Sequence, residues 1–547
     1  MSDTEAILSL EHLGVSLPKG ADRPHALSDV SLTIASNEIL CVVGESGSGK
    51  SMMANAIMRL LPNDVTIDAG RLMFEGRDLC ALDVAEMREV RGAGIAMIFQ
   101  EPMTALNPLR TIGDQIAEMF SIHTELSKAE IGARVQTLLE DVHIPDPIVA
   151  AKAYPHELSG GQRQRAMIAM ALALDPKLLI ADEPTTALDV TTQAQILKLI
   201  RDLQQRKKTA VLFITHDFGV VAEIADRVVV MQHGVIVEQG AAAAVLNEPQ
   251  HAYTKQLIAA VPPLKAPPPR ALSAENILTI SDVSKTYRSG GLLDGFLGRG
   301  ARVTPAVRRV SLNLPRGATL GIVGESGSGK STLARCIVRL IDPDAGSILL
   351  EGKDWAKLTR ENVRRETRHI QMVFQDPFAS LNPRRKAAEL VAQGPIVHGT
   401  PRSEAIAYAK ELFALVGLDP SAGDRFPHEF SGGQRQRIGL ARALALKPDV
   451  LIADEPVSAL DVSVQAQVLK LLAELRQRLG LSIVFITHDL RVAAQICDLV
   501  AVMKDGAVVE QGLAGQVFGN PQHPYTQALL NSIPGGDFTR KRDAMIV

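Results

Sequence analysis

An eight-residue motif that suits a nucleoside triphosphate occurs twice in the chain. GESGSGKS stands at 44–51 and again, letter for letter, at 324–331. It fits G-x-x-x-x-G-K-[ST], in which glycines turn backbone N–H groups toward the phosphates, the lysine reaches the β- and γ-phosphates, and the last hydroxyl ligates magnesium. The motif therefore predicts two triphosphate sites, formed by Gly44, Glu45, Ser46, Gly47, Ser48, Gly49, Lys50 and Ser51 and by Gly324, Glu325, Ser326, Gly327, Ser328, Gly329, Lys330 and Ser331.

An acidic pair follows a second repeated apolar run. LIADEP occurs at 179–184 and 451–456, and places Asp182 with Glu183 and Asp454 with Glu455. A carboxylate at a buried strand end is costly unless it has a charged partner, and bound magnesium supplies one for each aspartate. Each glutamate can then polarise the attacking water, a role worth ~10²–10⁴-fold in rate.

A third repeat, SGGQRQR at 159–165 and 431–437, predicts the start of a helix that continues through 166–174 in the first copy. Serine is a good N-cap, the two glycines permit close backbone approach, and the exposed N–H groups of a helix start bind anions. Such a helix does not easily reach the P-loop of its own copy, so its natural target is the γ-phosphate held by the other copy. The residues concerned are Ser159, Gly160, Gly161 and Gln162, and Ser431, Gly432, Gly433 and Gln434.

These motifs must be positioned by an α/β fold. Short apolar runs at 39–43, 178–181 and 210–215 predict buried parallel strands, and polar-apolar stretches at 191–205 and 464–478 predict helices between them. Strand–helix alternation implies right-handed crossovers in a mostly parallel sheet. The segment 127–141 predicts an amphipathic helix in a separate helical insertion.

The repeats divide the chain into two copies of one domain. FITHD also recurs, at 213–217 and 485–489, and 547 residues exceed what one core of ~250–300 residues holds. The sequence predicts a first domain at 1–261, a Pro-rich, semi-rigid linker at 262–276, and a second domain at 277–547.

Composition argues against several other classes of protein. Lys and Arg number 58 against 61 Asp and Glu, so the net charge of −3 gives no general attraction to nucleic acid. The four cysteines are far apart and form no CxxC, which argues against a disulfide scaffold, a zinc ribbon and an iron–sulfur cluster. With no secretory signal and no apolar stretch of ~18 residues, we expect a cytoplasmic protein or one on the cytoplasmic face of a membrane.

Together these residues resemble a family. Two P-loop domains carrying LSGGQ at 158–162 and FSGGQ at 430–434 look like the ATP-binding cassettes of ABC transporters, over nearly the whole chain. The resemblance implies ATP and Mg²⁺ as ligands. It also implies, in each copy, a RecA-like parallel-sheet core, a β subdomain and a helical insertion. By the same resemblance, Gln100 and Gln375 are Q-loop residues that bind nucleotide and metal, His216 and His488 are catalytic switch histidines, and 187–189 and 459–461 are D-loops.

Narrower features resemble one subfamily. The Q-loops continue as FQEPMTALNP at 99–108 and FQDPFASLNP at 374–383, and similar tails, NEPQHAYTKQLIAAVP and NPQHPYTQALLNSIP, follow at 247–262 and 520–534. Both are similar to the oligopeptide, dipeptide and nickel importer ATPases, and the fused arrangement is similar to the microcin C-type peptide importers and the glutathione importer. Several relatives carry a cysteine-rich iron–sulfur tail, which this chain lacks.

That resemblance implies an ATP hydrolase that energises peptide import on the cytoplasmic face of the inner membrane. It would work with two transmembrane permease subunits and an extracytoplasmic substrate-binding protein, and its halves would pair head-to-tail. The alternatives are a duplicated-cassette translation factor on the ribosome, or the fused ATPase of a nickel, glutathione, opine or sugar importer. The short linker and the tails favour transport over translation.

The two copies differ where the family stacks an aromatic ring on adenine. The second copy has Tyr287 near the end of its first strand, and the first copy, aligned on 7–8 and 277–278, has Leu17. The second copy also carries an insertion at 289–304, which we interpret as a surface hairpin.

Overall fold

The computed structural model describes residues 6–186, 188–289, 302–376, 380–458 and 460–536. The chain divides into two compact units, one of residues 1–188, 192–261 and 534–547, the other of residues 189–191 and 262–533. Most of the predicted insertion at 289–304, and Ala187 and Ala459 of the two D-loop motifs, lie outside the described residues.

The first unit alternates strands and helices after an opening pair of long strands. Its elements are β1 (Ala6–Ser16), β2 (His25–Ala35), β3 (Ile39–Val43), α1 (Lys50–Ile57), β4 (Thr66–Phe74), β5 (Arg77–Asp78), α2 (Val84–Ala93), β6 (Ile95–Ile98), α3 (Pro102–Ala105), α4 (Ile112–His123), α5 (Lys128–Asp141), α6 (Pro147–Lys152), η1 (Pro155–Glu157), α7 (Gly160–Ala171), β7 (Leu178–Asp182), α8 (Val190–Lys207), β8 (Ala210–Thr215), α9 (Phe218–Ile224), β9 (Arg227–Gln232), β10 (Val235–Ala241), α10 (Ala242–Asn247) and α11 (Ala252–Ala260).

Two sheets organise this unit. A six-stranded sheet has the order β10-β9-β3-β8-β7-β6, parallel except for the antiparallel edge strand β10, and a four-stranded antiparallel sheet has the order β2-β1-β4-β5. Each residue of β3, β7 and β8 is buried, as expected for strands covered on both faces. The predicted strands at 39–43, 178–181 and 210–215 are confirmed.

The second unit repeats this order of elements. Its elements are β11 (Asn276–Ser289), β12 (Arg302–Pro315), β13 (Thr319–Val323), α12 (Lys330–Ile337), β14 (Ala345–Leu350), β15 (Lys353–Asp354), η2 (Trp355–Lys357), α13 (Arg360–Glu366), η3 (Thr367–His369), β16 (Ile370–Val373), α15 (Ala387–Val397), α16 (Arg402–Leu415), η4 (Pro420–Asp424), η5 (Pro427–Glu429), α17 (Gly432–Leu444), β17 (Val450–Asp454), α18 (Val462–Leu479), β18 (Ser482–Thr487), α19 (Leu490–Ile496), β19 (Leu499–Lys504), β20 (Ala507–Leu513), α20 (Ala514–Gly519) and α21 (Pro524–Asn531).

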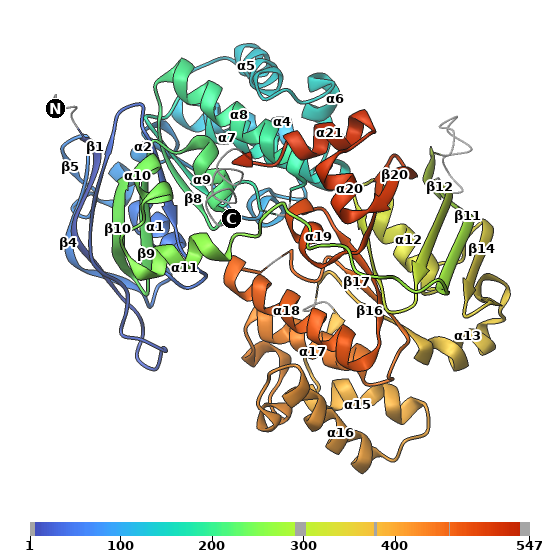
Figure 1. The fold of residues 1–547 in the computed structure, drawn as a ribbon. Helices are drawn as coiled ribbons and strands as arrows, with labels where there is room; N and C mark the ends of the chain where they lie inside the picture. Colours follow the sequence, from blue (N-terminus) through green and yellow to red (C-terminus); the bar gives the residue numbers. More distant parts are fainter. Residues whose placement is uncertain (1–5, 187, 290–301, 377–379, 459, 537–547) are drawn as a thin grey trace. The chain divides into compact units, whose positions relative to one another are not determined.

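Its sheets match those of the first unit. The six-stranded sheet has the order β16-β17-β18-β13-β19-β20 and the antiparallel sheet the order β12-β11-β14-β15. Within this unit the antiparallel strands β11, β12 and β14 and the helices α15 and α16 lie at opposite ends (Figure 1). Each unit therefore has the predicted parallel-sheet core, β subdomain and helical insertion.

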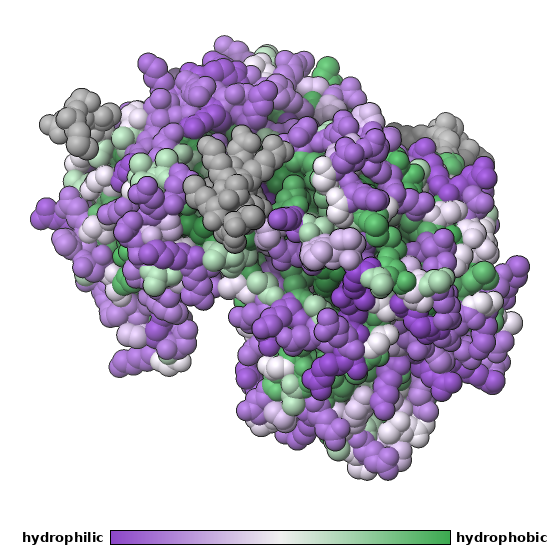
Figure 2. All heavy atoms as spheres, viewed as in Figure 1, coloured by the Kyte–Doolittle hydropathy of each residue, from purple (hydrophilic) through white to green (hydrophobic). Residues whose placement is uncertain are grey.

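The helical insertion of the first unit contains the predicted amphipathic helix. Ser127 caps α5 and forms a capping box with Glu130, while Ile131, Val135 and Leu138 are buried. The surface over α5, at the top of the view, is mostly hydrophilic (Figure 2). This is the pattern expected of a helix that packs on a core along one face.

One predicted boundary is wrong. We expected the helix at 160 to continue through 174, but α7 ends at Ala171, and Leu172 has φ −93° and ψ 3°. Asp175 then takes a left-handed φ of 51° before Pro176, and a residue that precedes proline is disfavoured in the helical region. Among the described residues, no helix is both long enough and apolar enough to cross a membrane.

Candidate functional site

The P-loop of the first unit connects the buried strand β3 to helix α1. Gly44 has φ 156°, and a Cβ there would lie 2.3 Å from the carbonyl oxygen of Met231. Gly49, the N-cap of α1, has a left-handed φ of 105°. A side chain at either position would force this turn open, so the loop geometry requires glycine. The second P-loop has the same conformation, with φ 150° at Gly324 and φ 100° at Gly329.

The P-loop lysines are buried against their own loops. Lys50 is 5% exposed, and its ammonium donates to the carbonyl oxygens of Gly44 at 2.7 Å and Glu45 at 2.9 Å. Lys330 donates to the corresponding oxygens of the second P-loop at 2.8 and 2.7 Å. Burial lowers the pKa of Lys330.

Each P-loop serine meets the first residue of the acidic pair. The hydroxyl of Ser51 donates to Asp182 Oδ1 at 3.1 Å, and that of Ser331 donates to Asp454 Oδ1 at 3.1 Å. The two aspartates are 5% and 3% exposed, and burial raises the pKa of each. A desolvated carboxylate beside a hydroxyl is a donor set that fits Mg²⁺, which binds one or two protein oxygens together with waters and substrate phosphates.

Within the part of the chain that the structure describes, no three His, Cys, Asp or Glu side chains converge as a metal cluster would require. A cation at Ser51 and Asp182, or at Ser331 and Asp454, would therefore depend on nucleotide phosphates to complete its coordination.

Glu183 follows Asp182 at the end of β7 and gathers three donors. Its Oε2 accepts hydrogen bonds from Gln100 Nε2 at 3.0 Å and from the Thr186 hydroxyl at 2.9 Å, and it lies 3.3 Å from His216 Nδ1. Burial alone would raise the pKa of Glu183, but the hydrogen bond and charge of His216 lower it to about 2. Glu183 is therefore ionised at neutral pH and can accept a hydrogen bond from water.

The second unit repeats this constellation. Glu455 Oε2 accepts from Gln375 Nε2 at 2.8 Å and lies 3.3 Å from His488 Nδ1. Burial opposes ionisation of both groups, but their mutual hydrogen bond outweighs it, so the pKa of Glu455 is lowered and that of His488 is raised. Glu183 and Glu455 both take left-handed backbone, with φ 46° and 47°. Such strain in a non-glycine residue is typical of functional sites.

The sheet topology explains why these side chains meet. In the first unit, P-loop, acidic pair, histidine and Q-loop follow β3, β7, β8 and β6, which are parallel neighbours. Their carboxyl ends therefore lie along one edge of the sheet, the usual ligand site of such folds. Gln100 and Gln375 contact the glutamates rather than the serine–aspartate pairs.

The SGGQ motifs form capped helix starts. Ser159 accepts from the N–H of Gln162, and Gln162 returns a side-chain bond to the Ser159 N–H, a capping box that Ser431 and Gln434 repeat. The second glycine of each motif packs closely, since a Cβ on Gly161 would lie 2.8 Å from the Thr192 methyl group. Gly160, Gly432 and Gly433 occupy the same first turns. Helix starts of this kind can bind an anion through their N–H groups.

The strand register supports the alignment of Leu17 with Tyr287. Leu8 pairs with Ile34 and Leu278 pairs with Leu314, and the pairings run in step as far as Ser16 and Thr286, one residue before Leu17 and Tyr287. Tyr287 is 39% exposed, whereas Leu17 packs against the core of its β subdomain.

Two contacts with the nucleotide sites were outside the sequence prediction. Arg23, in the loop between β1 and β2, donates to the carbonyl oxygen of Gly47 at the P-loop tip at 2.6 Å, and Thr186 bonds Glu183. No motif marked Arg23, because a single arginine in a loop has no periodic or spacing signal. Thr186 lies three residues after Glu183, a spacing that a strand-end turn brings together.

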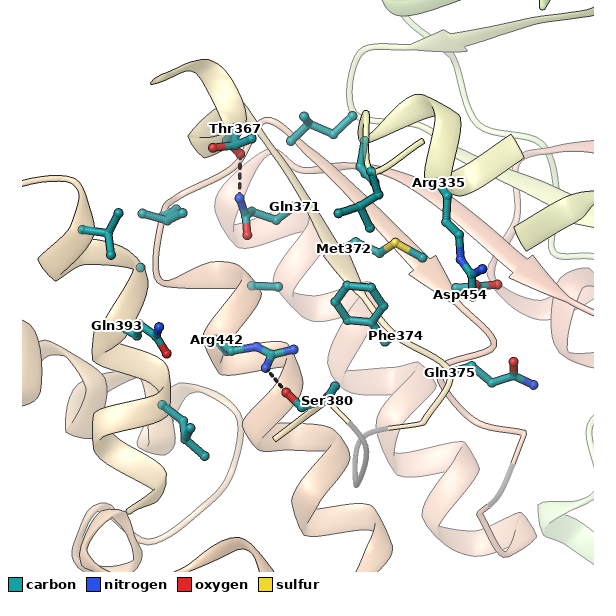
Figure 3. Close-up of a pocket in the computed structure, with 18 of the residues that line it drawn as sticks. Arg335, Thr367, Gln371, Met372, Phe374, Gln375, Ser380, Gln393, Arg442 and Asp454 are labelled. Carbon is teal, nitrogen blue, oxygen red and sulfur yellow. Dashed lines mark hydrogen bonds between the residues drawn. The ribbon is translucent and has the colours of Figure 1, made fainter. Parts of the chain in front are cut away.

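A groove of about 760 Å³ borders the Q-loop of the second unit. Its floor carries the Phe374 ring between Met372 and Arg442, with Gln375 directly beyond (Figure 3). The Arg442 guanidinium lies 6.0 Å from the Phe374 ring centre and donates to the carbonyl oxygen of Ser380. A segment bound in this groove would contact Phe374, which precedes Gln375 in the chain. Gln375 is the residue that donates to Glu455.

Comparison with known proteins gives matches along the chain. The model of the ABC transporter family matches residues 27–186 and 307–458, and the model of the oligopeptide/dipeptide transporter C-terminal region matches 237–282 and 509–546. The glutathione import ATP-binding protein of Escherichia coli K12 is 44% identical over 577 residues, covering 100% of this chain and 92% of that protein. The peptidoglycan transport ATP-binding protein of Agrobacterium fabrum C58 is 47% identical over 532 residues, covering 97% and 96%.

Proposed function

The chain belongs to the ATP-binding subunits of ABC transporters, in the peptide-type importer group with two cassettes, and from this premise we propose that it energises peptide uptake at the cytoplasmic face of the inner membrane. It is an ATP hydrolase coupled to transport. The observation that carries the peptide assignment is the oligopeptide/dipeptide C-terminal region, which follows both cassettes. This match, together with the identity to two transport ATP-binding proteins, favours transport over the ribosomal alternative.

Each site has groups for every part of the reaction. Lys50, Ser51 and the P-loop N–H groups hold the triphosphate, and Glu183 orients and polarises the attacking water, with His216 and Gln100 fixing its carboxylate. Mg²⁺, when bound at the serine and aspartate, neutralises charge on the phosphate oxygens. The second site has the same roles at Lys330, Ser331, Asp454, Glu455, Gln375 and His488.

The helix starts complete the sites in this proposal. Ser431, Gly432 and Gly433 would face the nucleotide of Lys50, and Ser159, Gly160 and Gly161 that of Lys330, so that the halves pair head-to-tail. The support is chemical: a helix N-terminus stabilises an anion within about one turn, and each unit offers one capped N-terminus with close-packed glycines. ATP would close this pair and hydrolysis would open it.

The partners follow from the importer assignment. Two transmembrane permease subunits would supply the membrane path, and a substrate-binding protein would deliver the solute from outside. The groove beside Gln375 favours docking of one permease segment there, because a segment in it would adjoin the glutamine that holds Glu455. Hydrolysis and transport would then be coupled through the Q-loop.

The solute contacts the partner subunits rather than this one. The choice among solutes therefore rests on the relatives of this chain. We propose peptides, including microcin C-like molecules, as the solute. Two relatives are named for the transport of glutathione and of peptidoglycan, so glutathione is among the alternatives to be tested. Nickel, opines and sugars are the remaining alternatives.

The test is stimulation of ATP hydrolysis in the assembled transporter by the loaded binding protein. Short peptides should raise the ATPase rate, and glutathione, nickel, an opine and a sugar should each leave it at the basal level. Stimulation by one of those four instead of peptides would replace the proposed solute. Cosedimentation with ribosomes rather than membranes would contradict the transport assignment.

A further inference from the structure

The two tails at 247–262 and 520–534 take no part in the chemistry above, yet a tyrosine of each contacts the P-loop of the same unit. The Tyr253 hydroxyl accepts the N–H of Glu45 at 3.1 Å and lies 3.4 Å from Glu45 Oε2. The Tyr525 hydroxyl accepts the N–H of Glu325 at 3.3 Å. Both rings are buried, 7% and 9% exposed. The same contact therefore forms in both units.

The first tail is fixed by its own contacts to the sheet. Glu238, on β10, accepts the N–H groups of Gln250 at 2.7 Å and His251 at 3.1 Å. His251 Nδ1 in turn accepts the N–H of Tyr253 at 3.2 Å, which caps helix α11. A charged acceptor for two N–H groups makes strong, directional bonds. The Tyr253 ring is thus held in one place relative to the sheet edge.

The second tail is fixed in the same way. Glu510, on β20, accepts the N–H groups of Gln522 at 2.8 Å and His523 at 3.1 Å, and His523 Nδ1 accepts the N–H of Tyr525 at 3.1 Å. The Lys504 ammonium lies 4.7 Å from the centre of the Tyr525 ring, a cation–π distance.

The tyrosine bond acts on a peptide group that the P-loop lysine also holds. Tyr253 accepts the N–H of Glu45, and Lys50 donates to the carbonyl oxygen of Gly44, in the same peptide group, at 2.7 Å. The motif requires that lysine to reach the β- and γ-phosphates, and a lysine directed there gives up bonds to its own loop. The bond between Tyr253 and the Glu45 N–H does not depend on where the lysine is directed.

We propose that Tyr253 and Tyr525 are positioning residues of the nucleotide sites, each keeping the first turn of its own P-loop in the phosphate-binding conformation. The inference rests on the proposed function, because it assumes that ATP binds at Lys50 and Lys330. It gives the tails a role in ATP binding within the same unit. The contacts described above are to Glu45 and Glu325 of the P-loops, so we expect the effect on ATP binding and not on the hydrolytic step.

The expected effect is a loss of ATP affinity at one site. A P-loop that adopts other conformations part of the time binds nucleotide more weakly in proportion to its competent fraction. One neutral hydrogen bond corresponds to a factor of roughly 2 to 12. Tyr253→Phe should therefore raise the ATP dissociation constant of the Lys50 site by about 2- to 12-fold, with kcat unchanged in the assembled transporter.

The test uses the full chain with one site disabled. In a Lys330→Ala background, fluorescent ATP with Mg²⁺ reports the Lys50 site, and in a Lys50→Ala background it reports the Lys330 site. Tyr253→Phe should weaken only the first and Tyr525→Phe only the second. Glu238→Gln, which loosens the tail but keeps Tyr253, should weaken the first site in the same direction. Tyr408→Phe, in α16 of the second unit, is the matched control, and thermal unfolding checks that every variant folds.

The outcomes separate the inference from the proposed function. If neither Lys50→Ala nor Lys330→Ala alters ATP binding, the assignment of the two nucleotide sites, and with it the proposed function, is wrong. Intact sites whose affinities change less than twofold on both tyrosine substitutions would overturn the positioning role. Equal weakening of both sites by Tyr253→Phe would also overturn it, because the contact lies within one unit. A fall in kcat at unchanged KM would contradict a role in ATP binding.

Discussion

Replacing Leu17 by tyrosine should tighten nucleotide binding at the Lys50 site, and replacing Tyr287 by leucine should weaken it at the Lys330 site. Leu17 directly follows β1, and Tyr287 stands at the matching place in β11 when the two strands are aligned by their pairings. In the family that the chain belongs to, an aromatic ring there stacks on adenine. Tyr287 has 39% of its surface exposed, so its ring is accessible for stacking.

The magnitude follows from the stacking energy. An aromatic face contributes about 0.5–1.5 kcal/mol beyond the area it buries, which is a factor of roughly 2 to 12 in affinity. The loss in Tyr287→Leu should fall near the upper end, because an exposed ring is replaced without disturbing the core. The gain in Leu17→Tyr should fall near the lower end, because Leu17 packs on the core of its β subdomain and part of that packing is lost.

The assay is equilibrium titration with a fluorescent ATP analogue, in single-site backgrounds. Lys330→Ala isolates the Lys50 site for Leu17→Tyr, and Lys50→Ala isolates the Lys330 site for Tyr287→Leu. A guanine nucleotide serves as a comparison, since stacking is largely independent of which purine is bound.

Two results would refute this reasoning. Unchanged affinities in both variants would show that the base does not lie over this strand position in either unit. A wild-type Lys50 site that binds more tightly than the Lys330 site would show that another side chain, such as Arg23 at the tip of the P-loop, replaces the ring.

Three further predictions concern the other parts of the sites. Glu183→Gln and Glu455→Gln should each lower steady-state ATPase by ~10²–10⁴-fold at their own site while ATP still binds; full activity after either change would reduce that cassette to a structural role. Ser431→Arg should block vanadate trapping of a photo-crosslinkable ATP analogue at the Lys50 site, and its effect on labelling should be non-additive with that of Lys50→Ala. Loss of label confined to the Lys330 site would contradict head-to-tail pairing. The pKa of Glu183 is about 2 in the folded protein, against 4.5 ordinarily, so its ionised form stabilises the fold above pH 4.5 and that stabilisation is lost as the pH falls toward 2. Between pH 4.5 and 2, the Tm of the Glu183→Gln variant should therefore fall less than the Tm of the wild type. Parallel Tm profiles of the two proteins would contradict this prediction.

Much of the fold was predictable because its signals are local. A run such as 39–43 is apolar at each position, so it indicates a strand buried on both faces, and Ser127 with Glu130 is a sufficient helix-start signal. The antiparallel edge strands β10 and β20 had no comparable signal, because an edge strand is only partly buried. The end of α7 also required the conformation of Asp175, which depends on the turn that follows it.

The motifs locate the site, but they do not predict its contacts. Asp182, Glu183 and His216 follow strands that the sequence identifies, and parallel strands bring such residues to one edge. Which donor reaches which acceptor depends on rotamers, and only the structure brings Gln100 to Glu183. The Tyr253–Glu45 bond joins residues more than 200 positions apart, and no spacing rule connects them.

Peptide uptake driven by this chain tests the proposed transport function most directly. The chain would be reconstituted in proteoliposomes with its two permease subunits and supplied with the binding protein and a labelled peptide. We expect uptake that requires MgATP and that is lost in the Glu183→Gln, Glu455→Gln double variant, although that variant still binds ATP. Uptake that persists in the double variant, or ATP hydrolysis without peptide uptake, would contradict peptide import driven by hydrolysis at these two sites.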